Sequence, residues 1–237
     1  MRFASGLFRR IRMSDVWHLT RSVALVAVCL FLVRAFLVEA FKIPTSSMEG
    51  TLLAGDFLLV NKAAYGAEIP GLGVSLPALA EPQRGDVIVF RPPHEPEIHY
   101  VKRLVGMPGD TLWMARKSLW VNGLRIAEPY AAYLDPYGDA VHPSMSWQRR
   151  YLRDLNPKRR YRPSRDNWGP LVVPPESFFV LGDNRDNSED SRYWGFVGRD
   201  AIEGQPWVVY YSSAAAGAGP ASLFGDVRWS RIGGLIR

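Results

Sequence analysis

RGDVIVFRPPHEPEIHYVKRLVG, residues 84–106, contains the two apolar runs that most clearly indicate the fold class. DVIVF follows a Gly-Asp pair that is typical of a turn, and it is rich in strand-forming residues. HYVKRLVG alternates from Tyr100 onward, which places Tyr100, Lys102 and Leu104 on one face of a predicted strand. The stretch therefore predicts short strands, one of which carries a lysine among apolar neighbours.

Segments on both sides of this stretch have the same character. The run TLWMARKSLWVNGLRI (111–126) holds Asn122-Gly123 between apolar segments, which is a strong signal for a hairpin. Eighteen prolines and twenty-one glycines favour short strands and turns over long helices. We therefore predict a mostly β protein from Phe41 onward. Further strand candidates are FLLVN (57–61), SFFVLGDN (177–184) and PWVVYYS (206–212).

Composition sets the limits of the interpretation. The chain has 237 residues, enough for one sizeable core or two small ones. Hydrophobic residues make up 47% and charged residues 22%, which excludes wholesale disorder, and the net charge of +6 indicates only a mild attraction to anionic surfaces. The single cysteine, Cys29, excludes an intrachain disulfide and a thiolate metal site. We expect no metal site, because the four histidines lack ligand-like spacing: His18, His94, His99 and His142.

The N-terminal region contains a long apolar run. Residues 22–33, SVALVAVCLFLV, carry no charge. With Arg21 and Arg34 at its rims, the run covers residues 16–38. An apolar helix needs roughly 20 residues to cross a bilayer, so the run predicts a single transmembrane anchor over 16–38.

The charges around this run predict an orientation. Four arginines precede it, and the positive-inside bias then places residues 1–15 in the cytoplasm and residues 39–237 outside the membrane. Two alternatives remain open. The run is also compatible with a cleavable signal peptide, because Val38 and Ala40 are small residues near its end. It is also compatible with a buried helix of a soluble domain.

Residues 149–165 form a basic segment, with eight arginines and lysines against the single acidic Asp154. The simplest interpretation is a solvated loop. Contact with anionic lipid headgroups is the alternative, since a basic side chain gains about 1 kcal/mol near such a surface. We expect no nucleic-acid partner, because the basic residues are confined to one loop.

Two features suggest chemistry. Pro44-Thr45-Ser46-Ser47-Met48 crowds three hydroxyls beside a proline of fixed φ, although a polar linker or a helix N-cap would also explain it. Lys102 lies in an apolar alternating strand. If its face points inward, desolvation lowers its pKa, and a neutral lysine can accept a proton from a serine hydroxyl. If the face points to solvent, Lys102 is an ordinary surface lysine, and strand alternation does not decide between the two.

Five segments together resemble a known family. They are VRAFLVEAFKIPTSSMEGTLLAGDFLLVNKAAYG (33–66), RGDVIVF (84–90), YVKRLVGMPGD (100–110), GDNRDNSEDSRYWGFV (182–197) and VRWSRIGGLIR (227–237). Through these segments, more than half of the chain resembles bacterial type I signal peptidases, which are Ser-Lys peptidases. The resemblance implies a mostly β, antiparallel-sheet catalytic domain with a variable β insertion at about 113–170, preceded by one transmembrane helix.

The resemblance implies roles for four residues. Ser47 matches the family's nucleophile and Lys102 its general base. Ser188 matches a serine that orients the lysine. The Thr45 hydroxyl and the Ser47 backbone N–H match the oxyanion hole. No cofactor is implied.

The resemblance also implies a supporting shell, a substrate site and a location. The implied substrates are signal peptides of exported preproteins, with small residues at −1 and −3, bound as an extended strand beside residues 99–104. The implied location is the plasma (inner) membrane of a cell, with a single-pass, monomeric enzyme facing outward. The structural charged residues are Asp183, Arg185, Asp190 and Arg192, and the pocket residues are Phe41, Ile43, Pro44 and Val101.

Three positions depart from the commonest family pattern: Ser46, Glu49-Gly50 and Thr45. We expect activity to survive them, because no proton-transfer group is missing. Other functions remain as alternatives. One is a specialised Ser-Lys processing protease of a secretion or conjugation system, and another is a membrane-anchored pseudoenzyme that binds export substrates. A Ser-His-Asp hydrolase would use His94 or His99, but no G-x-S-x-G surrounds Ser47.

Overall fold

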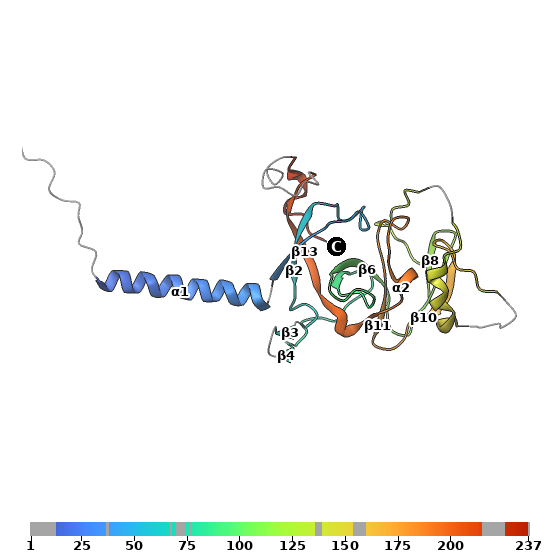
Figure 1. Ribbon diagram of the computed structural model, residues 1–237, viewed down its shortest axis with the longest axis horizontal. Coiled ribbons are helices and arrows are strands. Elements are labelled where there is room, and N and C mark those ends of the chain that lie inside the picture. Colours follow the sequence, from blue (N-terminus) through green and yellow to red (C-terminus); the bar gives the residue numbers. More distant parts are fainter. Residues whose placement is uncertain are drawn as a thin grey trace, which may run out of the picture.

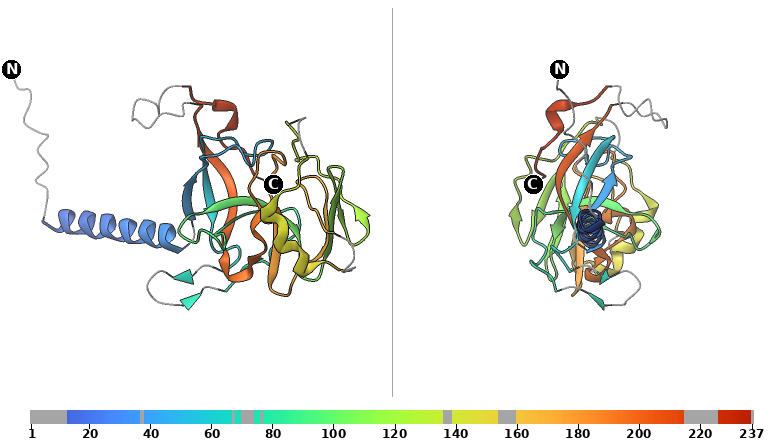
Figure 2. Two further views of the ribbon diagram at one scale, coloured as in Figure 1. Left: turned by 45° about the vertical axis from the view of Figure 1, so that its right-hand side comes forward. Right: turned by 90° about the vertical axis from the view of Figure 1, so that its left-hand side faces the viewer.

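A β-rich body with a projecting helix makes up the molecule. A computed structural model describes residues 13–36, 38–66, 68–69, 74–75, 77–135, 139–153, 160–214 and 226–236. The helix α1 (Met13–Phe36) projects from one end of the body, and a smaller sheet lies at the opposite end (Figure 1). Figure 2 shows the same arrangement from two further directions. The antiparallel β character predicted from the sequence is confirmed.

Helix α1 exposes apolar side chains along its middle, including Val23 at 60% and Leu25 at 64%. It ends at Phe36, and strand β1 (Val38–Lys42) follows almost at once. The predicted apolar span of 16–38 therefore contains most of the helix and the first residue of strand β1. In the part of the chain that the structure describes, no helix is both long and apolar enough to cross a membrane. Residues 1–12 lie outside the described residues.

The main sheet has seven strands in the order β1-β2-β13-β5-β6-β11-β12, and all neighbours are antiparallel. The long strand β13 (Ile202–Ser212) pairs with β2 through its C-terminal part and with β5 through its N-terminal part. It thereby joins the two halves of the sheet. The other strands are β2 (Asp56–Asn61), β5 (Val87–Phe90), β6 (Tyr100–Gly106), β11 (Ser177–Leu181) and β12 (Val197–Gly198).

A second sheet occupies the region predicted as an insertion, with strand order β10-β7-β8-β9. The predicted Asn122-Gly123 turn joins β8 to β9, and both residues have positive φ. The structure adds a turn that the sequence did not predict, at Arg116-Lys117, where two non-glycine residues have φ of 49° and 64°. Neither residue is a usual turn former, so the signal was absent. The strands are β7 (Thr111–Ala115), β8 (Ser118–Val121), β9 (Leu124–Arg125) and β10 (Trp168–Val172).

Short elements complete the described chain. The 3-10 helix η1 (Pro143–Tyr151) packs beside β10, and α2 (Ser191–Trp194) follows β11. The remaining elements are β3 (Glu68–Ile69), β4 (Val74–Ser75), η2 (Arg199–Ala201) and η4 (Trp229–Arg231).

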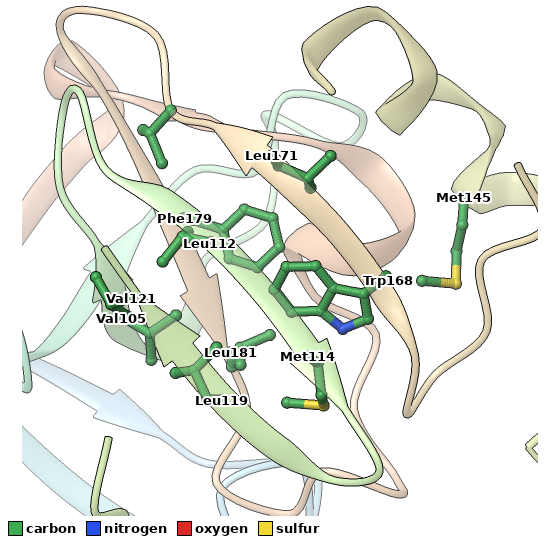
Figure 3. Close-up of a cluster of buried hydrophobic side chains, with 11 residues drawn as sticks. Val105, Leu112, Met114, Leu119, Val121, Met145, Trp168, Leu171, Phe179 and Leu181 are labelled. Carbon is green, nitrogen blue, oxygen red and sulfur yellow. The ribbon is translucent and has the colours of Figure 1, made fainter. Parts of the chain in front are cut away.

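The two sheets share a hydrophobic core. Phe179 on β11 stacks against Trp168 on β10, with ring centroids 5.1 Å apart, and both side chains are buried (Figure 3). A Cβ on Gly106 would collide with the side chains of Leu112 and Phe179, so the close approach of the sheets requires glycine there. The second sheet is therefore packed onto the main sheet by a continuous apolar cluster.

The basic segment 149–165 divides into two kinds of residue. Arg165 is 13% exposed and forms ion pairs with Asp135, Asp166 and Asp186, so the solvated-loop interpretation is wrong for it. The other described arginines are exposed to solvent, but two of them, Arg149 and Arg150, lie on η1 and not in a loop. Residues 154–159 lie outside the described residues. The exposed arginines are Arg149, Arg150, Arg153, Arg160 and Arg162.

Candidate active site

A serine hydroxyl and a lysine amine meet at the centre of the candidate site. The Lys102 Nζ donates a hydrogen bond of 2.7 Å to the Ser47 Oγ. Ser47 lies in a tight turn between β1 and β2, where the Leu52 N–H donates to the Met48 carbonyl over 2.8 Å. The Met48 side chain is 1% exposed and packs in the core beneath the turn. The buried methionine thus fixes the turn while its neighbour Ser47 stays partly accessible.

Lys102 is buried, which answers the question that strand alternation left open. Its side chain lies on β6 and is 5% exposed. Desolvation lowers its pKa from 10.5 to about 8; the positive charge of Arg192 adds to this effect, while Asp190, Asp183 and Glu189 oppose it. A substantial fraction of the amine is therefore neutral near pH 8 and able to accept a proton.

The hydroxyls beside Ser47 belong to the same site. The Thr45 Oγ1 lies 3.3 Å from the Ser47 Oγ, and Thr45 is exposed at the surface. The Asn187 side chain donates to the Ser46 Oγ over 2.9 Å. The side chains of the Pro44–Met48 segment therefore make specific contacts at the candidate site, and the segment is not a simple polar linker.

Ser188 lies beside Gly182, which in turn lies close to the backbone of Ser47. A Cβ on Gly182 would overlap the Ser188 hydroxyl and would lie 2.5 Å from the Ser47 carbonyl oxygen. Ser188 is 8% exposed, and in the described part of the chain its hydroxyl makes no hydrogen bond to Lys102. The structure therefore places Ser188 beside Ser47 without a bond to Lys102, and its predicted orienting role stays a prediction.

The four predicted charged residues are all buried, but only two of them pair with each other. Arg192 donates to both oxygens of Asp190, and Asp190 also accepts from the Gly182 N–H over 3.0 Å. Burial opposes the ionisation of Asp190, but Arg192 outweighs it and holds the pKa of the carboxyl below its usual value.

Asp183 and Arg185 have partners that the sequence did not reveal. Asp183 pairs with Arg103, which donates two bonds of 2.8 and 2.7 Å, and Arg185 pairs with Glu128 at 2.6 Å. Arg103 follows Lys102 on β6, so alternation puts the two on opposite faces, and a second cation inside an apolar strand was a usable signal. Glu128 gave no signal.

The predicted pocket residues are only partly brought together. Phe41, Ile43 and Val101 belong to one apolar cluster that also contains Met48, whereas Pro44 is exposed. The ring of His99 meets Phe41 edge-on at 5.1 Å. This contact brings β1, at one edge of the sheet, against the start of β6.

The histidines do not serve Ser47. His99 pairs with Glu203 over 2.9 Å, and His94 stacks on Trp194 at 5.4 Å between ring centroids. The described contacts give Ser47 a lysine partner, and a Ser-His-Asp arrangement has no support. An antiparallel β domain in which a buried lysine bonds a serine hydroxyl has the geometry that a serine hydrolase with a lysine base would require.

The comparisons with known proteins agree with that class. The family model for signal peptidases, peptidase S26, matches residues 16–211. The chain belongs to this family.

Signal peptidase I of Pseudomonas aeruginosa is 43% identical over 209 residues, covering 79% of this chain and 69% of that protein. Signal peptidase I of Aquifex aeolicus is 33% identical, covering 79% of this chain and 81% of that protein. A solved signal peptidase I of Enterococcus faecalis is 30% identical in sequence, and the match covers 53% of this chain and 96% of that chain, with a TM-score of 0.35.

Substituting alanine at Gly182 tests whether activity requires Ser188 and the Ser47 carbonyl to lie this close to Gly182. We expect Gly182→Ala to lower kcat/KM about 10²-fold, because the added methyl must push Ser188 and the Ser47 backbone apart. Peptide cleavage kinetics measure the loss. Leu124→Ala is the control, because its side chain is 71% exposed in the second sheet. Full activity in Gly182→Ala would show that the site tolerates the displacement.

Proposed function

We propose that this chain is a membrane-anchored endopeptidase that removes signal peptides from exported preproteins, with Ser47 as nucleophile and Lys102 as general base. The observation that carries the proposal is the 2.7 Å hydrogen bond between the buried Lys102 amine and the Ser47 hydroxyl. Membership of the signal peptidase family supplies the substrate class. The intact pair of residues speaks against a pseudoenzyme.

The proposed reaction proceeds through an acyl-enzyme. The Ser47 Oγ attacks the scissile carbonyl carbon while the neutral Lys102 amine accepts the hydroxyl proton. The resulting ammonium gives that proton to the leaving amine as the C–N bond breaks. Lys102, again neutral, then takes a proton from water, whose oxygen attacks the ester carbonyl carbon. As the ester C–O bond breaks, the Lys102 ammonium returns this proton to the Ser47 oxygen, which releases the signal peptide and restores both side chains.

Two donors are proposed to stabilise the oxyanion. The Ser47 backbone N–H and the Thr45 hydroxyl would bind the negative oxygen of the tetrahedral intermediate. The 3.3 Å separation of the Thr45 Oγ1 and the Ser47 Oγ supports this role. Donors of this kind contribute about 3 kcal/mol each to transition-state stabilisation. The buried hydroxyl of Ser188, which lies beside Gly182 close to Ser47, is proposed to orient Lys102 when the lysine changes protonation state.

The substrate is proposed to bind as an added strand. Strand β11 pairs with β6 from Arg103 to Gly106, so among the described residues Tyr100–Lys102 has no strand partner on that side. The contact of Phe41 with His99 brings the edge strand β1 near this open segment. An extended peptide lying there would place its −1 and −3 side chains against Phe41, Ile43, Pro44 and Val101. The resemblance to the family implies that these side chains are small.

The enzyme is proposed to act as a monomer, anchored in the plasma membrane through the apolar segment 16–38. The exposed apolar side chains of α1 and the uncharged run of residues 22–33 support the anchor. The arginines before the run support a cytoplasmic N-terminus, which would place the β domain on the extracytoplasmic side.

Cleavage of a preprotein with alanine at −3 and −1 tests the catalytic pair. We expect Ser47→Ala, Lys102→Met and Lys102→Arg each to lower the rate at least about 10³-fold, since arginine cannot lose its proton at working pH. Gel assays in detergent would measure it. Lys42→Met is the control, because Lys42 is an exposed lysine close to the site in sequence. Cleavage that persists in Lys102→Met would require a different base.

The pH dependence tests the state of Lys102. Because the neutral amine is the active form and its pKa is about 8, kcat should fall about tenfold per pH unit below pH 8 and level off above it. Rates on a substrate without ionisable groups near the cleavage site would measure the profile. An acid limb that continues to rise to pH 10 would mean that burial does not depress the lysine in the working enzyme.

Extraction of membranes with alkaline carbonate tests the anchor. We expect the full chain to stay in the membrane fraction. Val26→Arg combined with Val28→Arg should release a large part of it, because each arginine at a helix centre costs about 3 kcal/mol on insertion. Val26→Leu is the matched control. Release of the unaltered chain by carbonate would show that α1 does not anchor it.

A further inference from the structure

Residues 126–135 leave the second sheet and cross to the main domain beside the candidate site. The sequence assigned no role to this crossing segment, which belongs to the predicted insertion. The Ala132 N–H donates to the Asp183 carbonyl over 2.7 Å, and the Arg185 N–H donates to the Ala132 carbonyl over 2.9 Å. These two bonds form a parallel bridge between Ala132 and Asn184. The crossing segment therefore adds one strand-like contact to the loop after β11.

That loop is bonded in turn to the serine. The Asn184 N–H donates to the Ser47 carbonyl over 3.1 Å, and the Asn184 side chain donates to the Ser46 carbonyl over 3.3 Å. Asn184 therefore links the crossing segment to the backbone of Ser47. A shift of Ala132 would therefore be felt directly at Ser47.

A buried ion pair fastens the segment near the same point. Glu128 accepts two bonds from Arg185, of 2.6 and 2.8 Å, and the two side chains are 6% and 0% exposed. Arg185 also donates to the Gly182 carbonyl over 3.1 Å. Gly182 is the residue where Ser188 and the Ser47 carbonyl approach most closely. The charge of Glu128 thus holds the backbone on which both serines depend.

Tyr130 contacts the far side of the same site. Its ring lies over the guanidinium of Arg103, 3.9 Å from the ring centroid, and covers the Arg103–Asp183 ion pair. Its carbonyl oxygen would lie 2.9 Å from a Cβ on Gly50, three residues after Ser47. Gly50 has a φ of 116°, so this departure from the family pattern provides both the turn and the room for Tyr130.

The end of the segment is tied to both parts of the molecule. The Tyr133 hydroxyl donates to the Lys117 carbonyl of the second sheet over 2.7 Å. The Asp135 N–H donates to the Asp186 carboxylate of the main domain over 2.9 Å. These two contacts fix the position of the crossing segment relative to the turn that carries Ser47.

We infer that the crossing segment is a positioning element for Ser47, with Glu128 and Tyr130 as positioning residues of the insertion. The inference rests on the proposed function of Ser47. It assigns the predicted insertion a role in positioning that serine for the reaction. Neither residue touches substrate. Each acts through a neighbour, Glu128 through Arg185 and Tyr130 through Arg103 and Gly50.

Paired variants test the inference in the full chain. Tyr130→Leu removes the ring face and Glu128→Gln removes the charge. Both should lower kcat about 10²-fold with KM within about twofold of the parent, since a misplaced nucleophile weakens the transition state and leaves binding intact. Tyr130→Phe keeps the ring and Glu128→Asp keeps the charge, and both should recover most of kcat. Leu134→Ala, at a side chain 61% exposed in the same segment, is the control.

Amide hydrogen exchange over residues 44–52 gives a second readout that does not depend on turnover. We expect faster exchange in Tyr130→Leu and Glu128→Gln, and parental exchange in Tyr130→Phe and Leu134→Ala. Unchanged exchange and kcat in Tyr130→Leu and Glu128→Gln, measured well below the melting temperature, would overturn the inference. Cleavage that persists in Ser47→Ala would instead overturn the proposed function, so the two failures are distinguishable.

Discussion

The exclusion of water from the Lys102 amine is the constraint on which the rest of the structure depends. An amine that is 5% exposed favours its neutral form, and its pKa of about 8 makes it a base close to neutral pH. Burying an ionisable group has a cost in stability, which the fold must offset elsewhere. The apolar cluster that contains Met48 contributes such an offset, and Met48 also fixes the turn that carries Ser47.

The charges around Lys102 are arranged in pairs. Asp190 pairs with Arg192, Asp183 with Arg103, and each guanidinium is at most 2% exposed. An unpaired carboxylate beside the lysine would favour its charged form and raise its pKa again. Pairing limits that effect, so that desolvation dominates. The charged residues therefore tune the base as well as hold the loops in place.

The second sheet is joined to this arrangement by a shared core and by polar contacts. Phe179 and Trp168 connect the sheets through apolar packing, while the crossing segment carries Glu128 and Tyr130 to the ion pairs near Ser47. Packed interiors transmit small displacements, because they contain few voids that could absorb them. The insertion is thereby mechanically continuous with the candidate site.

The sequence by itself determined the strands around Val87–Phe90 and Tyr100–Gly106 and the Asn122-Gly123 turn, because alternation and turn chemistry are local properties. Its resemblance to a family singled out Ser47 and Lys102. Only the tertiary structure decided that Lys102 faces inward, and it alone showed the partners of Arg185 and Asp183. Those partners lie 57 and 80 residues away in the chain, and no periodic pattern records which distant side chains a fold brings into contact.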